Sequence, residues 1–365
     1  MVPKGLRVLA VSPVSGYGGF NTSIHRVRAL ESLGCKVDVI DSAWGHIGKW
    51  ESLGYRLRNR LFRTGLPVAL PDIALDGPRL IRAVQQTDWD VLWLEKTLTL
   101  DAEVLKEVRQ LSPELLIIGF SPDDMFGRHN QSQQFLEALR LYDVYLTTKS
   151  YNVVELQRLG CPKVLFVGNG YDPTAFRLVS VSMEDRERLG GDIGFIGSYE
   201  EERAAMMHYL AVNGLTVRIW GEGWNRMKRR HERLTLENRP LYGDDFPKAC
   251  VAFKINLGFL RKMNRDLQTT RSVEIPACGG FMLAERTQEH QELFEEGNEA
   301  GFFDTPEELL EKCRYYLAHS TVRERIALAG RQRCVTSRYS NEGRLATVLP
   351  GLLHRTRANN QRSML

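Results

Sequence analysis

The sequence predicts an α/β protein of two domains, each with a parallel sheet covered by helices. Two observations support this fold class. The chain has 365 residues, more than a single domain usually contains. Short aliphatic runs alternate with helical stripes over residues 6–167, and the alternation begins again near residue 192. Such alternation favours parallel strands joined by right-handed crossovers.

The first half of the chain contains six predicted strands. They are short aliphatic or β-branched runs at Leu6–Ser12, Lys36–Ile40, Val91–Leu94, Leu115–Phe120, Val144–Thr147 and Val164–Val167. Apolar residues at helical spacing separate most of them, beginning with the stripe Phe20, Ile24, Val27 and Leu30. We expect one Rossmann-like sheet with helices on both faces, in a first domain of residues 1–176.

A polar, turn-rich stretch follows, and a second Rossmann-like domain is expected over residues 177–340. Its predicted strands are Ile193–Ile196, Val217–Trp220, Val251–Leu257 and Phe281–Leu283. Helices are expected at about 200–213 and from Arg271, and two capping boxes, Thr305–Glu308 and Thr321–Glu324, predict two further starts. Residues 341–365 are expected to form a helix that stops near Pro350, followed by a basic tail, and to pack back on the first domain.

Composition excludes several classes of protein. Lys and Arg number 49 against 45 Asp and Glu, and a net charge of +4 gives no reason to expect nucleic acid as a partner. The six cysteines form no CxxC pair or Cys/His cluster, so we expect neither a metal site nor disulfides. No apolar run approaches the roughly 20 residues of a membrane span. Because the first apolar run reads as a strand and not as a signal peptide, we expect a cytoplasmic protein.

The first strand leads into a glycine-rich loop, Ser12–Thr22, with Gly16, Gly18 and Gly19. Glycines allow a ligand to approach backbone N–H groups, just where the following helix presents its positive end. The loop matches neither GxGxxG nor a P-loop, which disfavours a dinucleotide or Walker-type site. By itself it is consistent with a ligand loop or with a tight turn before a helix.

Two further segments carry a specific resemblance. Gly168–Phe176 reads GNGYDPTAF, and Arg271–Gly280 reads RSVEIPACGG, with Asp266 eight residues before Glu274. These segments resemble group-1 glycosyltransferases of the GT-B architecture, in which two Rossmann-like domains face a common cleft and a Glu-x7-Glu pair handles the donor. Asp266 replaces the first Glu of that pair. The blocks GFIGS at 194–198 and WGEGW at 220–224, with SPDD at 121–124, are similar to the spore-maturation-protein-like branch.

The resemblance implies transfer of a sugar from a nucleotide-sugar donor to a hydroxyl of a glycan, lipid-linked or protein-borne acceptor. It implies retention of configuration, with no metal and no cofactor besides the donor. Glu274 would accept hydrogen bonds from ribose hydroxyls at the cleft rim, and cations and amides would hold the diphosphate. The donor-binding residues are expected to be Glu274, Arg203, Gly197, Ser198, Thr269, Thr270, Gly18 and Gly19.

The expected catalytic residues are Asp266, Arg271, Asp123 and Asp124. Arg271 would stabilise the leaving phosphate, with Arg265 and Lys254 as weaker candidates. In an inverting enzyme, Asp123 or Asp124 would act as the base on the acceptor hydroxyl.

Three alternatives stay open at this stage. The chain could bind a sugar nucleotide or glycan without turnover, or it could be a sugar-nucleotide epimerase of the same architecture. The stretch from Lys49 to Arg63 mixes arginines with apolar residues, and it suits either peripheral contact with an anionic membrane or a solvated helix that covers the sheet. The base and sugar of the donor, the acceptor and the linkage cannot be read from these residues.

Overall fold

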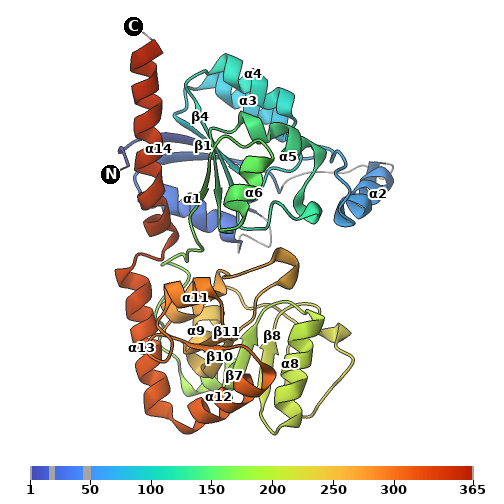
Figure 1. Ribbon diagram of the computed structural model, residues 1–365, viewed down its shortest axis with the longest axis vertical. Helices are drawn as coiled ribbons and strands as arrows, with labels where there is room; N and C mark the ends of the chain where they lie inside the picture. The colour runs from blue at the N-terminus through green and yellow to red at the C-terminus, as the bar shows by residue number, and fades with distance from the viewer. Residues whose placement is uncertain (1, 16–20, 44–50, 364–365) are drawn as a thin grey trace. The chain divides into compact units, whose positions relative to one another are not determined.

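The computed structural model describes residues 2–15, 21–43 and 51–363, and these form two compact units (Figure 1). Unit 1 comprises Met1–Gly168 together with Asn341–Leu365, and unit 2 comprises Asn169–Ser340. The division after Gly168 places the GNGYDPTAF segment, apart from its first residue, in unit 2, whereas the sequence placed it in the first domain.

The sheet of unit 1 has six parallel strands in the order β2-β1-β3-β4-β5-β6. The strands are β1 (Arg7–Ser12), β2 (Lys36–Asp41), β3 (Val91–Glu95), β4 (Leu116–Ser121), β5 (Val144–Thr147) and β6 (Val164–Phe166). Each coincides with one of the predicted runs to within a residue or two. Every residue of β3 and β4 is buried, which explains why both read as unbroken apolar runs instead of alternating ones.

Helices cover both faces of this sheet. One face packs against α1 (Thr22–Ser32) and α14 (Asn341–Ser363) through Val8 and Ala10. Leu9 and Val11 point to the other face. The helices on that face are α3 (Asp76–Gln86), α4 (Ala102–Leu111), α5 (Gln133–Ala138) and α6 (Asn152–Arg158).

Two helices of unit 1 differ from expectation. Pro350 does not end α14, which continues to Ser363. Proline removes one backbone hydrogen bond from the helix. The helix continues because Leu349, Leu352 and Leu353, on both sides of the proline, stay buried against the sheet. The helix α2 (Glu51–Arg63) does not cover the sheet with its leucines, because Leu53 is 71% and Leu57 60% exposed.

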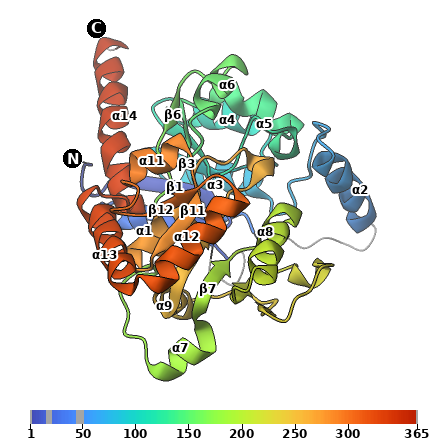
Figure 2. The same cartoon turned by 60° about the horizontal axis from the view of Figure 1, so that its bottom comes forward.

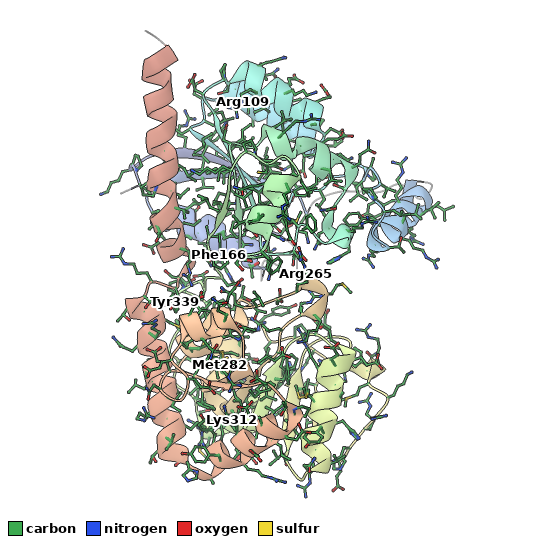
Figure 3. All side chains as sticks on the ribbon, viewed as in Figure 1. Arg109, Phe166, Arg265, Met282, Lys312 and Tyr339 are labelled. Atoms are coloured by element: carbon green, nitrogen blue, oxygen red, sulfur yellow. The ribbon has the colours of Figure 1, made fainter. Side chains whose placement is uncertain are left out.

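The sheet of unit 2 also has six parallel strands, in the order β12-β11-β10-β7-β8-β9. The strands are β7 (Gly191–Ile196), β8 (Val217–Trp220), β9 (Leu234–Leu236), β10 (Phe253–Gly258), β11 (Met282–Glu285) and β12 (Gly301–Phe303). Residues 251 and 252, predicted as strand, instead end the helix before β10. Figure 2 shows β11 and β12 beside α12, the helix that follows β12. Figure 3 shows Met282 of β11 inside the unit.

Helices flank this sheet as well. One face packs on α8 (Glu201–Val212) and α12 (Pro306–Ala318). The other face packs on α7 (Met183–Leu189), α9 (Asp245–Ala252), α10 (Arg271–Ala277) and α11 (Gln288–Leu293). The helix α13 (Ser320–Thr336) contributes to both faces, with Ile326 on the first and Cys334 on the second. Thr305 caps α12 as predicted, by accepting a bond from the Glu308 amide. The Thr321 capping box is wrong: α13 starts at Ser320, and only His319 separates it from α12.

The two parallel, helix-covered sheets confirm the predicted fold of two Rossmann-like domains. All six cysteines are buried and free. None of the helices in the described part of the chain combines the length and the apolar character that a membrane-spanning segment needs.

Candidate functional site

The predicted donor-binding residues of unit 2 gather at one edge of its sheet. The chain runs from β7 outward to β8 and β9, and then returns to place β10 on the other side of β7. Strand order therefore reverses between β7 and β10, and in open parallel sheets ligands bind outside the carboxyl ends of the strands at such a point. Gly197, Ser198 and Arg203 follow β7, while Asp266 through Glu274 follow β10. The topology thus brings both groups to the same edge.

The turn after β7 is built on close backbone contacts. The Gly197 amide donates to Trp220 O at 2.8 Å, and its carbonyl accepts from Trp224 Nε1 at 2.8 Å. Both backbone groups of Gly197 are therefore engaged within unit 2, and its role in donor binding stays a prediction. Gly221, with φ +140°, allows this approach, because a Cβ there would lie 2.0 Å from Gly197 O. Ser198 is exposed, and only its carbonyl, which binds Arg203, is engaged within the described residues.

Arg203 is a cation held under the β7 turn. It is 7% exposed, its Nη1 donates to Ser198 O at 3.1 Å, and its guanidinium lies 5.6 Å from the centre of the Phe195 ring. Burial has the largest effect on the pKa of Arg203 and lowers it. The nearby Arg261 also lowers this pKa, whereas Glu200 and, to a smaller extent, Glu285 and Asp266 raise it. Its Nε has no hydrogen-bond partner among the residues that the structure describes. The side chain thus retains an unused donor close to the carboxylates of the neighbouring loop.

Arg271 and Glu274 form an ion pair across the first turn of α10. Arg271 also donates from Nε to Ile196 O at 3.3 Å, and its guanidinium lies 4.4 Å from the centre of the Phe246 ring. The arginine side chain is 36% exposed, whereas the glutamate is 1% exposed. Burial raises the pKa of Glu274, and Arg271 and the Thr270 hydroxyl oppose that rise.

Glu274 was expected at the cleft rim with a carboxylate able to accept from ribose hydroxyls, whereas its side chain is only 1% exposed in the structure. Its oxygens face Arg271 and Thr270, and the accessible group at this point is the Arg271 guanidinium. A ribose could bond to Glu274 only by displacing one of these two donors. The role expected of Glu274 stays a prediction, and its observed interaction is to hold Arg271 against β7.

Asp266 lies in the loop between β10 and α10. It is 8% exposed, and its carboxylate accepts from the Arg261 amide at 3.2 Å, while its own amide donates to Arg261 O at 3.2 Å. These bonds close the loop on itself. The exposed Arg265, at its tip, has φ +48° (Figure 3). Asp266 therefore has a fixed position close enough to Arg203 to affect its pKa.

The segment from Leu267 to Ser272 is held by α11, which sequence reasoning did not connect with the site. Thr287 Oγ1 donates to Leu267 O at 2.6 Å, and Gln268 Nε2 donates to Glu289 at 2.7 Å. Each bond joins residues about 20 positions apart. Local sequence patterns carry no signal for such contacts.

A hydrogen-bonded chain through His290 fixes Thr269. His290 Nδ1 lies 2.6 Å from Glu285 O, a carbonyl that can only accept, so Nδ1 carries the proton. Burial lowers the pKa of His290 to about 4, so the ring is neutral near pH 7 and Nε2 accepts from the Ser272 hydroxyl at 2.7 Å. Ser272 Oγ in turn accepts from the Thr269 amide at 3.0 Å. Every donor and acceptor in this chain has one defined direction.

The predicted base candidates of unit 1 have different environments. Asp124 is 1% exposed and accepts from the amides of Phe126 and Gly127, both at 3.1 Å, and from Asn152 Nδ2 at 2.9 Å. With these hydrogen bonds, the Asp124 carboxylate holds the turn after β4. Asp123 is about a quarter exposed and pairs with Lys96, which follows β3. Of the two carboxylates, Asp123 is the more exposed, and the role of either as a base stays a prediction.

Unit 1 also contains a buried network of hydrogen bonds and an ion pair that the sequence analysis did not predict. Glu95, at the end of β3, pairs with Arg26 of α1 and accepts from the hydroxyls of Ser23 at 2.7 Å and Ser12 at 3.3 Å. It fixes the start of α1 next to the glycine loop. Gly18 and Gly19, the loop residues predicted to contact the donor, lie outside the described residues.

Lys254 is not at the candidate site. It is the second residue of β10, at the amino end of the strand, and its Nζ pairs with Asp192 at 2.7 Å. The sequence run Val251–Leu257 predicted this strand but started it two residues too early. Lys254 therefore stood in the middle of the predicted strand and not at its amino end.

Part of the chain matches a known protein family. Residues 203–350 match a family described as glycosyl transferase-like. Among curated proteins, none matches the chain in sequence.

Solved structures share the two-domain fold. HepE of Anabaena, in complex with UDP and glucose, is 12% identical with a TM-score of 0.62, over 95% of this chain and 99% of that one. Sucrose-phosphate synthase of Thermosynechococcus elongatus is 12% identical with a TM-score of 0.62, over 97% and 100%. A putative UDP-N-acetylglucosamine 2-epimerase of Listeria monocytogenes is 12% identical with a TM-score of 0.51, over 95% of each chain. The chain thus has the GT-B fold, and its residues 203–350 are similar to a glycosyl transferase-like family; together these findings support the resemblance to the group-1 superfamily.

Proposed function

We propose that this chain is a glycosyltransferase that uses a nucleotide-sugar donor, with the donor diphosphate bound at the carboxyl edge of the unit 2 sheet. The observation that carries the proposal is the position of Arg203 and Arg271 at the reversal of strand order, inside the segment that matches the glycosyl transferase-like family. HepE, which shares the fold, was solved with UDP and with UDP-glucose, and this supports the class of donor.

The cations suit the charge that develops during transfer. When the bond from sugar to phosphate breaks, negative charge grows on the leaving diphosphate, and fixed cations there stabilise the transition state more than the ground state. Arg271 is accessible and is held by Glu274 and Ile196 O, so a phosphate meets a guanidinium already in place. Arg203 lies behind Ser198 and adds positive potential from the β7 side.

The acidic residues of the site take separate roles in this proposal. Asp266 is fixed by Arg261 and serves the sugar of the donor, as the resemblance implies. Glu274 positions Arg271 and exchanges one of its hydrogen bonds for a ribose hydroxyl when the donor binds. Transfer proceeds with retention and needs no metal. In an inverting reaction, Asp123 of unit 1 would be the base, because Asp124 is occupied in its turn.

The test begins with donor binding. Melting temperatures measured with UDP, GDP, dTDP and CMP identify the base, because a ligand that binds only the folded state raises the melting temperature. Arg271→Lys keeps the charge beside Glu274 but loses the two-pronged geometry of the guanidinium, and we expect nucleotide affinity to fall at least tenfold. Arg314→Lys, an exposed arginine of α12, is the matched control and should leave affinity unchanged.

Turnover then separates the proposed transferase from the alternatives. A transferase releases nucleoside diphosphate from a nucleotide sugar, rapidly with an acceptor and slowly by hydrolysis without one. Conversion of the donor alone into an isomeric nucleotide sugar, with no release of nucleotide, would identify an epimerase instead. Tight donor binding with no release of nucleotide in any acceptor mixture would identify a binding protein.

A further inference from the structure

Helix α2 of unit 1 presents leucines to solvent. Leu53 is 71%, Leu57 60% and Leu61 36% exposed, and they occupy every fourth position of the helix. Residues at this spacing lie on the same side of a helix. Both ribbon views place α2 at the margin of unit 1, away from its sheet (Figure 1, Figure 2). An exposed apolar stripe of this kind indicates an interaction surface.

The opposite side of α2 holds the helix on unit 1. Phe62 is 8% exposed, and Tyr55 and Asn59 line a cavity of about 210 Å³ together with other residues of unit 1, Leu70 among them. An α-helix turns by about 100° per residue, so Leu57 lies about 160° from Tyr55 and about 140° from Phe62 around the helix axis. The packing of α2 on unit 1 therefore leaves the leucine stripe facing outward, and burial in the protein's own core does not explain it.

Arginines flank the leucine stripe on both sides. Because successive residues of a helix are about 100° apart, Arg56 and Arg58 stand to either side of Leu57, and Arg60 lies on the same side as Arg56. These three arginines and Arg63 are exposed, and their guanidinium groups make no hydrogen bond or ion pair with the residues that the structure describes. The helix carries one glutamate against these four arginines, so its net charge is positive.

The chemistry of both groups of side chains selects the partner. A second copy of this chain could cover the leucines, but a symmetric contact through α2 would bring the arginines of one copy against those of the other, and juxtaposed like charges weaken association. The stripe is the convex outer side of one helix, a shape that a soft planar surface covers more completely than a rigid protein does. An anionic bilayer satisfies both groups, because leucines enter the boundary between headgroups and acyl chains while arginines bind phosphates beside them.

We propose that α2 docks unit 1 on an anionic phospholipid surface. Leu53, Leu57 and Leu61 insert among the headgroups, the flanking arginines bind lipid phosphates, and the helix lies along the surface without crossing it. Each cation near such a surface strengthens binding about fivefold, so the arginines make binding depend on anionic lipid. The proposal goes beyond the reaction proposed above and does not depend on it.

Co-sedimentation of the full chain with phosphatidylcholine vesicles, with and without phosphatidylglycerol, tests this proposal. We expect at least tenfold tighter binding when phosphatidylglycerol is present, and loss of that difference at high salt, because salt screens charges at a surface. Leu53→Gln/Leu57→Gln removes most of the stripe, and Arg56→Glu/Arg60→Glu reverses two flanking charges; each should weaken binding at least tenfold. Because all four side chains are exposed, both variants should keep the melting temperature of the wild type.

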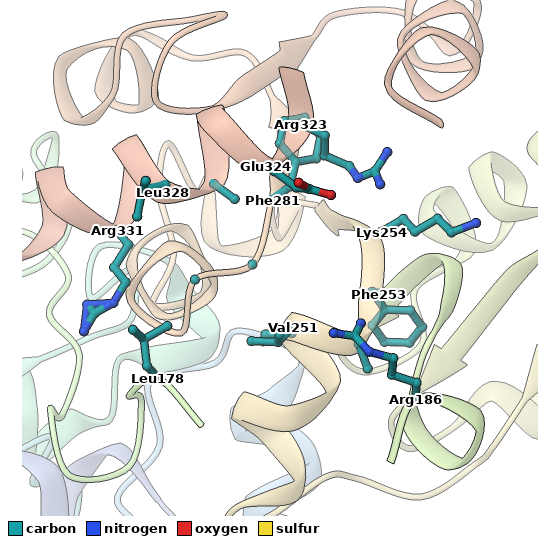
Figure 4. A pocket seen from close by; sticks show the side chains of 15 residues that line it. Leu178, Arg186, Val251, Phe253, Lys254, Phe281, Arg323, Glu324, Leu328 and Arg331 are labelled. Atoms are coloured by element: carbon teal, nitrogen blue, oxygen red, sulfur yellow. The ribbon is translucent and has the colours of Figure 1, made fainter. Parts of the chain in front are cut away.

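Unit 2 provides matched controls. Leu178 and Leu328, which line a pocket of that unit (Figure 4), are 55% and 71% exposed, so Leu178→Gln/Leu328→Gln removes a similar amount of exposed leucine. Arg229→Glu/Arg314→Glu replaces two exposed arginines and makes the same change in net charge as the arginine variant of α2. Both controls should bind the anionic vesicles as tightly as the wild type.

The proposal is overturned if the wild type does not bind vesicles that contain phosphatidylglycerol, if the α2 variants bind them as tightly as the wild type, or if the controls lose binding equally. It is also overturned if the wild type dimerises in sedimentation velocity and Leu53→Gln/Leu57→Gln abolishes the dimer, because a second copy then covers the stripe. A failure of UDP to bind would count against the proposed function and would leave the vesicle result unchanged.

Discussion

Replacing Arg271 by alanine should destabilise the protein more than replacing its partner Glu274 by glutamine. The two side chains form one ion pair, but they differ in their access to water, with 36% of the arginine and 1% of the glutamate side chain exposed. Loss of the glutamate leaves a guanidinium that water can reach. Loss of the arginine leaves a buried carboxylate with the Thr270 hydroxyl as its remaining side-chain donor.

The structure sets the size of this difference. Removing one partner of a buried ion pair costs roughly 3–5 kcal/mol. Because water reaches this pair from the arginine side, we expect the lower end for Arg271→Ala, about 3 kcal/mol. In Glu274→Gln, a neutral amide can still accept from Arg271 and Thr270, and we expect a loss of about 1–2 kcal/mol. For a domain of this size, about 3 kcal/mol corresponds to a fall of roughly 6–12 °C in melting temperature.

The cost of Arg271→Ala should depend on pH. Burial already raises the pKa of Glu274 above its ordinary value of 4.5, and loss of Arg271 raises it further. A carboxyl whose pKa is higher in the folded state binds its proton more tightly there. Its contribution to stability is thus present below the unfolded pKa and is lost as pH rises through the folded pKa. The gap between wild type and Arg271→Ala should be widest near pH 8 and narrower near pH 5.

The assay is urea or thermal unfolding of the wild type, Arg271→Ala and Glu274→Gln at pH 5, 6.5 and 8. Equal destabilisation by the two variants at pH 8, or a gap that does not narrow toward pH 5, would refute the reasoning from burial. Arg271→Lys provides the check on charge, because it should recover most of the stability that alanine loses while still binding nucleotide weakly.

Three further predictions test other parts of both units. The pKa of His290 is about 4 in the folded protein against 6.5 ordinarily, so stability falls as pH drops from 6.5 to 4; His290→Gln should flatten that acid limb in thermal melts. Asp124→Asn should cost about 2 kcal/mol in urea unfolding and Asp123→Asn less than about 1, because Asp124 is buried with three donors. Gly221→Ala places a Cβ 2.0 Å from Gly197 O at φ +140° and should lower the urea midpoint by the equivalent of more than about 2 kcal/mol.

The sequence was most informative where burial is complete. The strands β3 and β4 are buried along their whole length, so hydrophobicity alone located them. The three-residue strands β9 and β12 were not predicted, because so short a segment has no distinctive period. The helix α3 was not predicted, because the residue before it is not a capping residue. Leu75, with φ +55°, holds that position, and the first amides of the helix are bound by the carboxylate of Asp72, three residues earlier.

The candidate site was predictable to the extent that it follows strand ends. Gly197 directly follows a predicted strand and Arg271 begins a predicted helix, and the parallel topology brings the segments after β7 and β10 to one edge. The burial of Glu274 was not predictable, because it depends on packing around α10. Contacts such as Ser272 with His290, or Arg26 with Glu95, join distant residues through side chains, and one sequence without its fold gives no register for them.

The inaccessibility of Glu274 changes what the carboxylate contributes to a donor site. An exposed glutamate would be a flexible ligand for ribose, and its charge would be screened by water. A buried one acts as a fixed counter-charge that holds Arg271 in a single orientation against Ile196 O. A cation positioned before the ligand arrives does not have to be ordered during the reaction, and such preorganisation makes it effective at a leaving diphosphate. The pairing that reduces the access of Glu274 to ribose therefore strengthens the case for Arg271 as the phosphate-binding group.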